Sequence, residues 1–579
     1  MRQVSSITVS PQSAFVGASQ VAPFTANVTG GSSGVAWSVN GIGGGNSTVG
    51  TIDSSGNYTA PAVTANSTAT VTATSMSDPT KSASASVTII AAGVVAATTN
   101  PQVATYAITP PSTANVNIQF GTDTTYGLTT WQQPTPAGGG PVSIFVAGMR
   151  INTPYHMRAV LKFADGTEFD DVDHSITTGD IPVANLPSVS TVTTAGATPQ
   201  PGVELLDLVG GVAQRSIAVS DLAGNIIWTY DTGLAQAFIG DPVKLLPNGH
   251  FLMNVGLGAP DGANSFLREV DLVGNTIWQM DFGQLNKALS LATCLGCNIT
   301  VVGAHHDFVA LPNGHILVLA AETLPESGLT GYPNPVNVTG DVIIDLDENH
   351  VPVWIWSEFD HLDLNRHPIL FPDWTHTNAI VYSPDDKALI ISVRHQHWIV
   401  KIDYNDGQGT GDIIWKLGHE GDFALQGGTD PQDWFYAPHD VNIISPNSTG
   451  MFQLLLFDNG NQRVLDSIGT TCGTTVPCES RVPIMQLDET AKTATIEWVD
   501  DLDPLFSIFG GSARLLANGN VEFDECAPTV TGTNTLTSKG IITEVTKTTP
   551  PQTVFQMTVT GQNAYRAFRI PSLYPGVQW

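Results

Sequence analysis

Alternation between apolar and polar residues marks the first third of the chain as a series of β-strands. Residues 6–10 and 68–74 alternate at every position, and residues 154–161 follow the same pattern. A period of two predicts strands that bury one face and expose the other. Turn-forming residues separate these runs, so we predict two small β-sandwiches, one over residues 1–92 and one over residues 93–180.

The rest of the chain carries an internal repeat. It follows a Pro-, Ser- and Thr-rich stretch at residues 181–200, which we expect to be a linker. One element of the repeat is a strand that ends in Trp after a turn. Copies end at Trp228, Trp278, Trp354, Trp415 and Trp498, with a weaker sixth copy at Phe555.

The second element of the repeat is a hairpin centred on Asn-Gly, as at Asn248-Gly249 and Asn313-Gly314. Asn-Gly is the strongest short hairpin signal, because a type I′ turn needs positive φ at both central residues. Hairpins and Trp strands together predict an all-β chain with a six-bladed β-propeller over residues 201–579. A β-helix is the alternative, although its repeats are shorter and lack paired hairpins.

Composition limits what such a chain binds. Only 13% of the 579 residues are charged, and the formal net charge is −30. A chain this acidic does not bind nucleic acid or an anionic membrane through its overall field. No apolar run reaches about 18 residues, so we expect no membrane-spanning segment.

The cysteines point to an oxidising compartment. Cys294 and Cys297 form one close pair, Cys472 and Cys478 form another, and Cys526 stands alone. A zinc site is the alternative, but the second spacing is unlike that of zinc ligands. We therefore expect two short-loop disulfides and a periplasmic or extracellular protein. The first residues contain no apolar signal-peptide core, so either a signal peptide has been removed from this chain or export follows another route.

Three successive repeats place a histidine at a similar position upstream of the hairpin turn. These residues are His306, His376 and His439. The first strand of each propeller blade lines the central channel, so equivalent positions in neighbouring blades converge on its axis. A lone histidine is usually a satisfied interior residue, but three at one position along the repeat indicate a shared site.

Arg394 extends this predicted cluster. The midpoint between His376 and Arg394 falls in the turn at residues 383–387, so a regular hairpin would place them opposite each other, roughly 5 Å apart at Cβ. A guanidinium beside several imidazoles forms a cationic pocket that suits sulfate, phosphate or carboxylate. A metal site on the three imidazoles and a solvated or acid-paired Arg394 are the alternatives. We expect neither a metal ion nor another cofactor.

The region 201–579 resembles the bacterial arylsulfate sulfotransferases, which are propeller enzymes that use no nucleotide sulfate donor. The resemblance rests on residues 304–315, 376–380, 392–394, 439–441 and 565–571. Residues 1–92 resemble the bacterial Ig-like domains of group 2, through the strand around Trp37 and the segment 50–61. Residues 93–180 resemble a fibronectin type III module.

In that family one channel histidine is the nucleophile and becomes transiently sulfated, while two other histidines and an arginine hold the sulfuryl oxygens. The resemblance implies that His439 is the nucleophile and that His306, His376 and Arg394 hold the oxygens. His305 is the alternative to His306, because the two are adjacent. Candidates for contact with the substrate are His305, Trp374, Trp398 and Tyr436; for the aromatic residues, packing within the blades is the alternative.

The resemblance implies a ping-pong enzyme that moves a sulfuryl group from a small aryl sulfate donor to a phenolic acceptor. The contrasting hypothesis is a non-enzymatic cell-surface propeller that binds sulfated or other anionic glycans, with the sandwiches as its stalk. A binding protein needs cationic donors but no nucleophile. The effect of replacing His439 therefore separates the two hypotheses.

Overall fold

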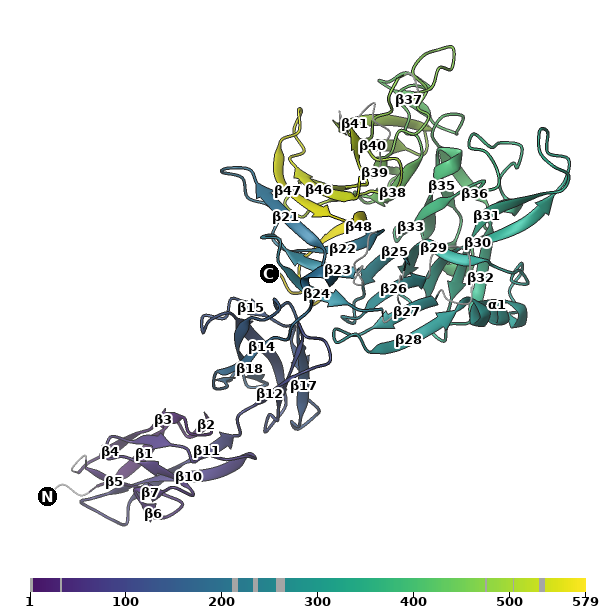
Figure 1. Ribbon diagram of the computed structural model, residues 1–579. Coiled ribbons are helices and arrows are strands. Elements are labelled where there is room, and N and C mark those ends of the chain that lie inside the picture. Colours follow the sequence, from purple (N-terminus) through teal and green to yellow (C-terminus); the bar gives the residue numbers. More distant parts are fainter. Residues whose placement is uncertain are drawn as a thin grey trace. The chain divides into compact units, whose positions relative to one another are not determined.

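The computed structural model describes residues 4–31, 34–210, 217–232, 238–256, 266–473, 476–502, 505–530 and 537–579 (Figure 1). The chain is all-β, as predicted, and α1 (Phe282–Leu291) is the one α-helix within these ranges. No helix in them is both long and apolar enough to span a membrane. The chain forms two compact units, Met1–Asp180 with Trp579, and Ile181–Gln578.

The first unit contains two apolar cores. One is enclosed by sheets from the first ninety or so residues and includes Trp37, Tyr58 and Val71. The other includes Tyr106 and Phe120. The longer strands around the first core are β1 (Ser6–Ser10), β2 (Ser13–Gly17), β4 (Thr25–Thr29), β5 (Val35–Val39), β10 (Ser67–Ser75) and β11 (Ser82–Ile90); those around the second are β12 (Val94–Ala97), β13 (Ala104–Ile108), β14 (Ala114–Gly121), β17 (Val142–Val146) and β18 (Pro154–Phe163).

The second unit consists mainly of four- and five-stranded antiparallel sheets that follow one another along the chain. The first is β48 (Asn563–Ile570), β22 (Val203–Val209), β23 (Ile217–Asp221) and β24 (Ile226–Tyr230). The second is β25 (Phe238–Leu245), β26 (Phe251–Gly256), β27 (Phe266–Val270) and β28 (Thr276–Asp281). The third is β29 (Gly303–Ala310), β30 (Ile316–Glu326), β31 (Val336–Leu346) and β32 (Pro352–Ser357).

The remaining sheets continue the series. The fourth is β33 (Thr377–Ser383), β34 (Ala388–Val393), β35 (Trp398–Ile402) and β36 (Ile413–Leu417). The fifth is β38 (Pro438–Ile443), β39 (Met451–Asp458), β40 (Arg481–Asp488) and β41 (Thr493–Asp501), with β37 (Ala424–Gln426) added in parallel to β41 on its edge. The sixth is β43 (Ser512–Leu515), β44 (Val521–Cys526), β46 (Lys539–Val545) and β47 (Thr553–Thr560), with β21 (Ser188–Thr193) on its edge.

The innermost strands of these sheets contact one another in the cyclic order β48, β25, β29, β33, β38, β43 and back to β48. The C-terminal strand β48 joins the first sheet by pairing with β22, so the two ends of the repeat region share one sheet (Figure 1). This is the arrangement of a β-propeller, in which each sheet is a blade.

The repeated tryptophans lie in the fourth strand of their sheets, where several connect neighbouring blades. Indole N–H groups donate across blade boundaries from Trp228 to the Leu272 carbonyl, from Trp356 to the Gly411 carbonyl, from Trp415 to Glu489 Oε1 and from Trp498 to the Thr548 carbonyl. In the third blade this donor is Trp356, two residues after the predicted Trp354. A buried indole needs an acceptor for its N–H, and the next blade supplies it.

The Asn-Gly hairpins differ from the predicted type I′ turn. Gly249 and Gly314 have positive φ, of 80° and 86°, but the preceding asparagines do not. In the first hairpin Gly249 donates to the Leu246 carbonyl, and Asn248 Oδ1 accepts from the His250 amide at 3.0 Å. The proline before Asn has its φ fixed at a value that suits a type I turn, so only Gly enters the left-handed region.

Residues 181–200, predicted to be a linker, contain the edge strand β21. It pairs with β47 along its whole length, from Ser188 opposite Thr560 to Thr193 opposite Phe555. The exposed edge of β47 supplies backbone partners that local sequence cannot reveal.

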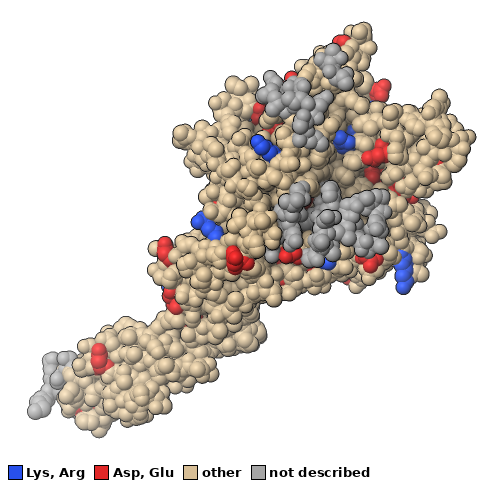
Figure 2. All heavy atoms as spheres, viewed as in Figure 1, with Lys and Arg blue, Asp and Glu red and all other residues tan. Residues whose placement is uncertain are grey.

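Charged groups are sparse on the face that Figure 2 shows, and neither sign forms a broad patch there.

Candidate active site

The predicted histidines lie at the same end of three neighbouring innermost strands. His306 lies in β29, His376 directly precedes β33, and His439 is the second residue of β38. These strands all run from this end toward their hairpin turns, and β33 contacts both β29 and β38. Residues at the starts of the strands therefore gather at one end of the channel.

The backbone is irregular at each of these histidines. The ladder shifts register beside His306 in β29, beside His376 in β33 and directly after His439 in β38. His306, His376 and Asp440 have positive φ, of 60°, 51° and 52°. Left-handed backbone is costly for residues other than glycine, and bulges redirect side chains. The strand ends are thus shaped to point these side chains toward one another.

Histidine rings from adjacent blades meet at the centre of the group. The ring centroids of His306 and His376 are 4.6 Å apart, and His376 stacks on His395 at 4.6 Å. Arg394 Nη1 donates to His395 Nε2 at 2.5 Å, and His376 Nδ1 lies 2.5 Å from Asp373 Oδ2. Side chains from β29, the start of β33 and the turn after β34 thus form one continuous cluster.

His305 contacts both His306 and Asp341. His305 Nε2 is 3.0 Å from Asp341 Oδ1, and the Nδ1 atoms of His305 and His306 are 2.7 Å apart. Because the carboxylate accepts the Nε2–H of His305, Nδ1 of that ring in its neutral form accepts a hydrogen bond. We infer that His306 donates its Nδ1–H there and keeps a lone pair on Nε2. His306 is the one that contacts His376.

His439 is held in a single tautomer. Its Nδ1 lies 2.6 Å from Asn459 Oδ1, while the Asn459 amide donates to the carbonyls of Ser507, at 2.7 Å, and Gly510, at 3.0 Å. These two donations fix the amide, so its oxygen faces His439 and accepts the Nδ1–H. The Gly510 N–H points at Nε2 from 3.3 Å. Nε2 of His439 therefore carries the lone pair.

Glycine is required beside this ring. Gly510 and Gly511 have φ of 65° and 101°, and a Cβ on Gly510 would lie 2.8 Å from Cys526 Cβ. A side chain here would strain the backbone and push the Gly510 amide away from His439.

Burial keeps the central imidazoles uncharged. The pKa of His439 lies well below the ordinary 6.5 because of burial and then the Arg394 charge, although the hydrogen bond to Asn459 opposes the shift. Burial, followed by the neighbouring His376 and His305, likewise lowers the pKa of His306 well below its ordinary value. Burial and His376 lower the pKa of His395 to about 4. At neutral pH these three rings are therefore uncharged, and each has one nitrogen with a free lone pair or a lone pair that accepts a hydrogen bond.

Arg394 joins the cluster through His395, which stacks on His376, and not as the ladder partner of His376. The β33–β34 ladder ends at Thr377 opposite Val393, and Arg394 begins the 3-10 turn η4 (Arg394–Gln396). Arg394 Nη2 donates to the Ile508 carbonyl at 3.0 Å. Its Nε is buried without a hydrogen-bond partner among the residues that the structure describes. An oxyanion would satisfy this donor, whose isolation costs about 1–3 kcal/mol.

Tyr565 lies between the two halves of the cluster. Its ring centroid is 5.9 Å from that of His306 and 6.2 Å from that of His439. The next residue, Arg566, is fully buried. Both belong to β48 and fall in the C-terminal segment that carried the family resemblance, but no spacing rule connected that segment with the histidines. Only the pairing of β48 with β22 brings them to the channel.

The three predicted aromatic contacts are core residues. Trp374, Trp398 and Tyr436 are 0%, 6% and 4% exposed. Trp374 donates to the Arg366 carbonyl, Trp398 to the His419 carbonyl and Tyr436 to the Pro431 carbonyl. Their polar atoms are occupied and their rings are packed, which matches the packing alternative.

One group of three ligand-type side chains lies within the described ranges: Asp373, His376 and His395, whose ligand atoms are within 4.8 Å of one another. Both nitrogens of His395 are already in use, since Nδ1 bonds the Asp373 carbonyl at 2.8 Å and Nε2 accepts from Arg394. A metal ion bound there would have to displace the guanidinium and sit beside its charge.

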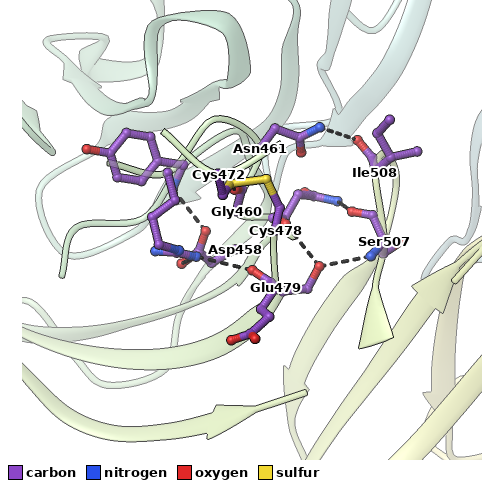
Figure 3. The surroundings of a disulfide bond; sticks show 12 residues. Asp458, Gly460, Asn461, Cys472, Cys478, Glu479, Ser507 and Ile508 are labelled. Carbon is purple, nitrogen blue, oxygen red and sulfur yellow. Dashed lines mark hydrogen bonds and ion pairs between the residues drawn. A yellow bond between two sulfur atoms is a disulfide. The ribbon is translucent and has the colours of Figure 1, made fainter. Parts of the chain in front are cut away.

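A disulfide supports the loop that holds His439. The structure pairs Cys294 with Cys297 and Cys472 with Cys478, as predicted, and Cys526 is buried outside both bonds. Figure 3 shows the Cys472–Cys478 bond beside Gly460. Gly460 directly follows Asn459, the residue that accepts the hydrogen bond from His439.

The loop after Cys478 continues this support. Ser480 Oγ donates to the Asn459 carbonyl at 3.0 Å and accepts from the Ser507 amide at 2.9 Å. Asn461 donates to the Ile508 carbonyl at 3.1 Å, the same oxygen that Arg394 contacts (Figure 3).

Comparison with known proteins points to one family. The family model described as Arylsulfotransferase (ASST) matches residues 193–569. A search of curated proteins gives no match. Among solved structures, dihydro-heme d1 dehydrogenase NirN in complex with DHE is 10% identical over 66% of this chain and 80% of its own, with a TM-score of 0.27. A putative phosphatase from Bacteroides thetaiotaomicron is 9% identical over 81% and 97%, with a TM-score of 0.29. Scores this low carry no information about function.

Proposed function

The chain belongs to the arylsulfotransferase (ASST) family, and from that premise we propose that it transfers a sulfuryl group from an aryl sulfate to a phenol through His439. The observation that carries the proposal is the neutral, single-tautomer imidazole of His439, whose Nε2 lone pair is directed by Asn459. The guanidinium of the half-buried Arg394 interacts electrostatically with this ring. A buried nucleophile and a nearby oxyanion donor suit group transfer.

The first half-reaction forms a sulfohistidine. The lone pair on His439 Nε2 attacks sulfur, the bond from sulfur to the aryl oxygen breaks, and the aryl oxide leaves with its electron pair. A phenol with a pKa near 10 leaves more readily than an alcohol. The ring becomes cationic when Nε2 binds sulfur, and Asn459 Oδ1 stabilises that charge through the Nδ1–H.

The second half-reaction restores the enzyme. An acceptor phenol attacks sulfur, the nitrogen–sulfur bond breaks, and its electron pair returns to Nε2 while the phenol proton passes to solvent. Charge develops on the non-bridging sulfuryl oxygens, as it does in phosphoryl transfer. Arg394, His306 and His376 are the donors that we assign to those oxygens. A bound anion favours the protonated form of a neighbouring imidazole, which can then donate to it.

The test of this function is release of 4-nitrophenol from 4-nitrophenyl sulfate, with and without added phenol, in chelator and without a nucleotide donor. We expect release that requires phenol and gives parallel double-reciprocal lines. Release without an acceptor would indicate a sulfatase, and inhibition by chelator would indicate a metal enzyme. No release with several phenols would favour the glycan-binding hypothesis.

The two disulfides support a periplasmic or extracellular location.

The pH dependence follows from the lowered pKa of His439. We expect kcat/KM to stay level as pH falls from 7 through the ordinary histidine value of 6.5, and to decline only below it. The unfolded chain titrates near 6.5, so stability conferred by neutral buried histidines is present above that pH and is lost as pH falls further. A melting temperature measured at each pH separates titration from unfolding. A half-point at or above 6.5 would contradict the expectation.

The disulfides provide a matched pair of variants. Replacing Cys472 and Cys478 by serine should lower the melting temperature, with a loss of roughly 2 kcal/mol from the loop-closure term. It should also lower kcat/KM by about tenfold, because the bond supports the residues that hold Asn459. The same change at Cys294 and Cys297 should reduce stability alone. Equal activity in the two double variants would show that the Cys472 loop has no part in positioning His439.

A further inference from the structure

A buried charged layer lies directly next to the histidine cluster. Arg566 Nη1 is 3.9 Å from Asp307 Oδ1 and 3.8 Å from Asp440 Oδ1. Its Nη2 donates to the Asn378 carbonyl. Arg566 is 0% exposed, so these groups replace water as its partners. In the ladder between β22 and β48, Arg566 lies opposite Asp207.

Each partner of Arg566 adjoins a site residue. Asp307 follows His306, Asp440 follows His439, and Asn378 comes two residues after His376. Arg566 itself follows Tyr565. One guanidinium therefore contacts the three strands that carry the histidines, at the points where their ladders shift register.

The two carboxylates are themselves held from the far side. Asp307 accepts from Lys244 Nζ at 2.5 Å and from the Ile380 amide at 2.8 Å. Asp440 forms a two-point ion pair with Arg514 and accepts from the Ala513 amide at 3.0 Å. The result is a chain of alternating charges, cation to anion, that crosses the channel from β25 to β43. Its members are Lys244, Asp307, Arg566, Asp440 and Arg514.

Backbone that leaves the ladder has lost its regular hydrogen bonds, so other groups must fix it. The guanidinium of Arg566 reaches all three strands at once, through one hydrogen bond from Nη2 and two ion-pair contacts of Nη1. A lysine ammonium is a single point charge without this spread of nitrogen atoms. We propose that Arg566 is a positioning residue, which sets the three histidine strands relative to one another and keeps a permanent positive charge beside the sulfuryl site. The proposal rests on the function proposed above.

The charge has a second consequence, for titration. Arg566 is among the groups that lower the pKa of His306 and His439, together with burial and the other nearby cationic groups. The groups facing His439 are Arg394, His376, Arg566, Asn459 and Tyr565; those facing His306 are His376, His305, His439, Arg566 and Tyr565. Removing Arg566 also leaves Asp307 and Asp440 less compensated, which raises the same pKa values further. Both effects of removing Arg566 therefore raise the pKa values of His306 and His439.

The test compares two buried arginines of the same strand. Arg566→Met should lower kcat/KM by about 100-fold and move the acid limb of the pH profile to higher pH. Arg566→Lys keeps the charge but cannot reach Asn378, Asp307 and Asp440 at once, so it should lower kcat/KM while leaving the acid limb close to its wild-type position. Arg569→Met is the control. Arg569 is bound by Glu204, Glu522 and Glu544 at the far end of β48, so its loss should reduce stability without shifting the limb.

A measurement without turnover keeps the proposal testable on its own. Histidine ¹³Cε1 NMR titration, assigned with His306→Gln and His439→Gln variants, should show higher pKa values for both rings in Arg566→Met. If Arg566→Met does not fold, the kcat/KM of Arg566→Lys decides: a lowered value supports the proposal, and a wild-type value overturns it. An unchanged acid limb and unchanged ring titration in Arg566→Met would overturn the proposal, as would an equal limb shift in Arg569→Met. Absence of transfer in the wild type would remove the proposed function, and the titration would still decide the role of Arg566.

Discussion

Replacing His439 by alanine should reduce phenol-dependent release of 4-nitrophenol by at least about 10⁴-fold, because the variant lacks the atom that bonds sulfur. Among the rings of this cluster, His439 is the one whose Nδ1 is held by a side-chain amide, that of Asn459. His306 Nδ1 faces His305, His376 Nδ1 is bound to Asp373, and His395 is held by the Asp373 carbonyl and Arg394. The measurement is initial rate at saturating donor and acceptor. Mass spectrometry of the quenched wild type with donor alone should show one added sulfuryl group on the peptide that contains His439.

The control for this experiment is His250→Ala. His250 lies in the first hairpin and pairs with Glu269 at 2.6 Å, away from the cluster. It should retain full activity, and both variants should melt as single cooperative transitions. Substantial transfer by a folded His439→Ala protein would sink the covalent mechanism. If both the wild type and His439→Ala bind sulfate equally well and neither transfers it, the binding-protein hypothesis is favoured.

Replacing Arg394 by methionine should lower kcat/KM by about 10²–10³-fold, the usual effect of losing one oxyanion donor. Methionine fills a similar volume, so packing is largely kept. The expected loss is in kcat more than in KM, because the charge on the sulfuryl oxygens grows in the transition state. Arg394→Lys should recover part of the activity, since it restores charge without the planar donors. Steady-state kinetics over donor concentration give both constants.

Arg268→Met is the matched control for Arg394. Arg268 lies in β27, donates to Gln279 and Tyr230, and is distant from the channel histidines in the fold. It should leave both kinetic constants unchanged. If Arg394→Met raised KM alone and kept kcat, Arg394 would serve ground-state binding rather than the transition state.

Much of the fold followed from short-range patterns. Alternation of period two predicted strands, and the Trp repeat predicted a series of similar sheets, because each blade meets the same packing demand at its boundary. Trp415, for example, donates to the next blade as Trp228 does. The conformation of the Asn-Gly hairpins and the edge strand β21 escaped prediction, since the first depends on the proline and the second on a partner strand far along the chain.

The sequence by itself determined that His306, His376 and His439 stand at equivalent points of successive blades, because repeated units place equivalent residues alike. It also predicted that one local hairpin sets Arg394 opposite His376; in the structure the hairpin ladder stops one residue earlier, and His395 links the two side chains. It could not determine the tautomer of His439, which depends on Asn459 and on carbonyls of the loop at Ser507 and Gly510.

Only the tertiary structure placed Tyr565 and Arg566 at the channel, because β48 reaches its sheet by pairing with β22 at the other end of the repeat region. Only it showed Trp374, Trp398 and Tyr436 to be core residues, since closeness in sequence to a site residue does not decide the face on which a side chain lies. Residue types and their spacing along the chain thus predicted which chemical groups form the site. Its geometry and proton affinities arise from burial and contacts between distant segments, which exist only once the ring of sheets has formed.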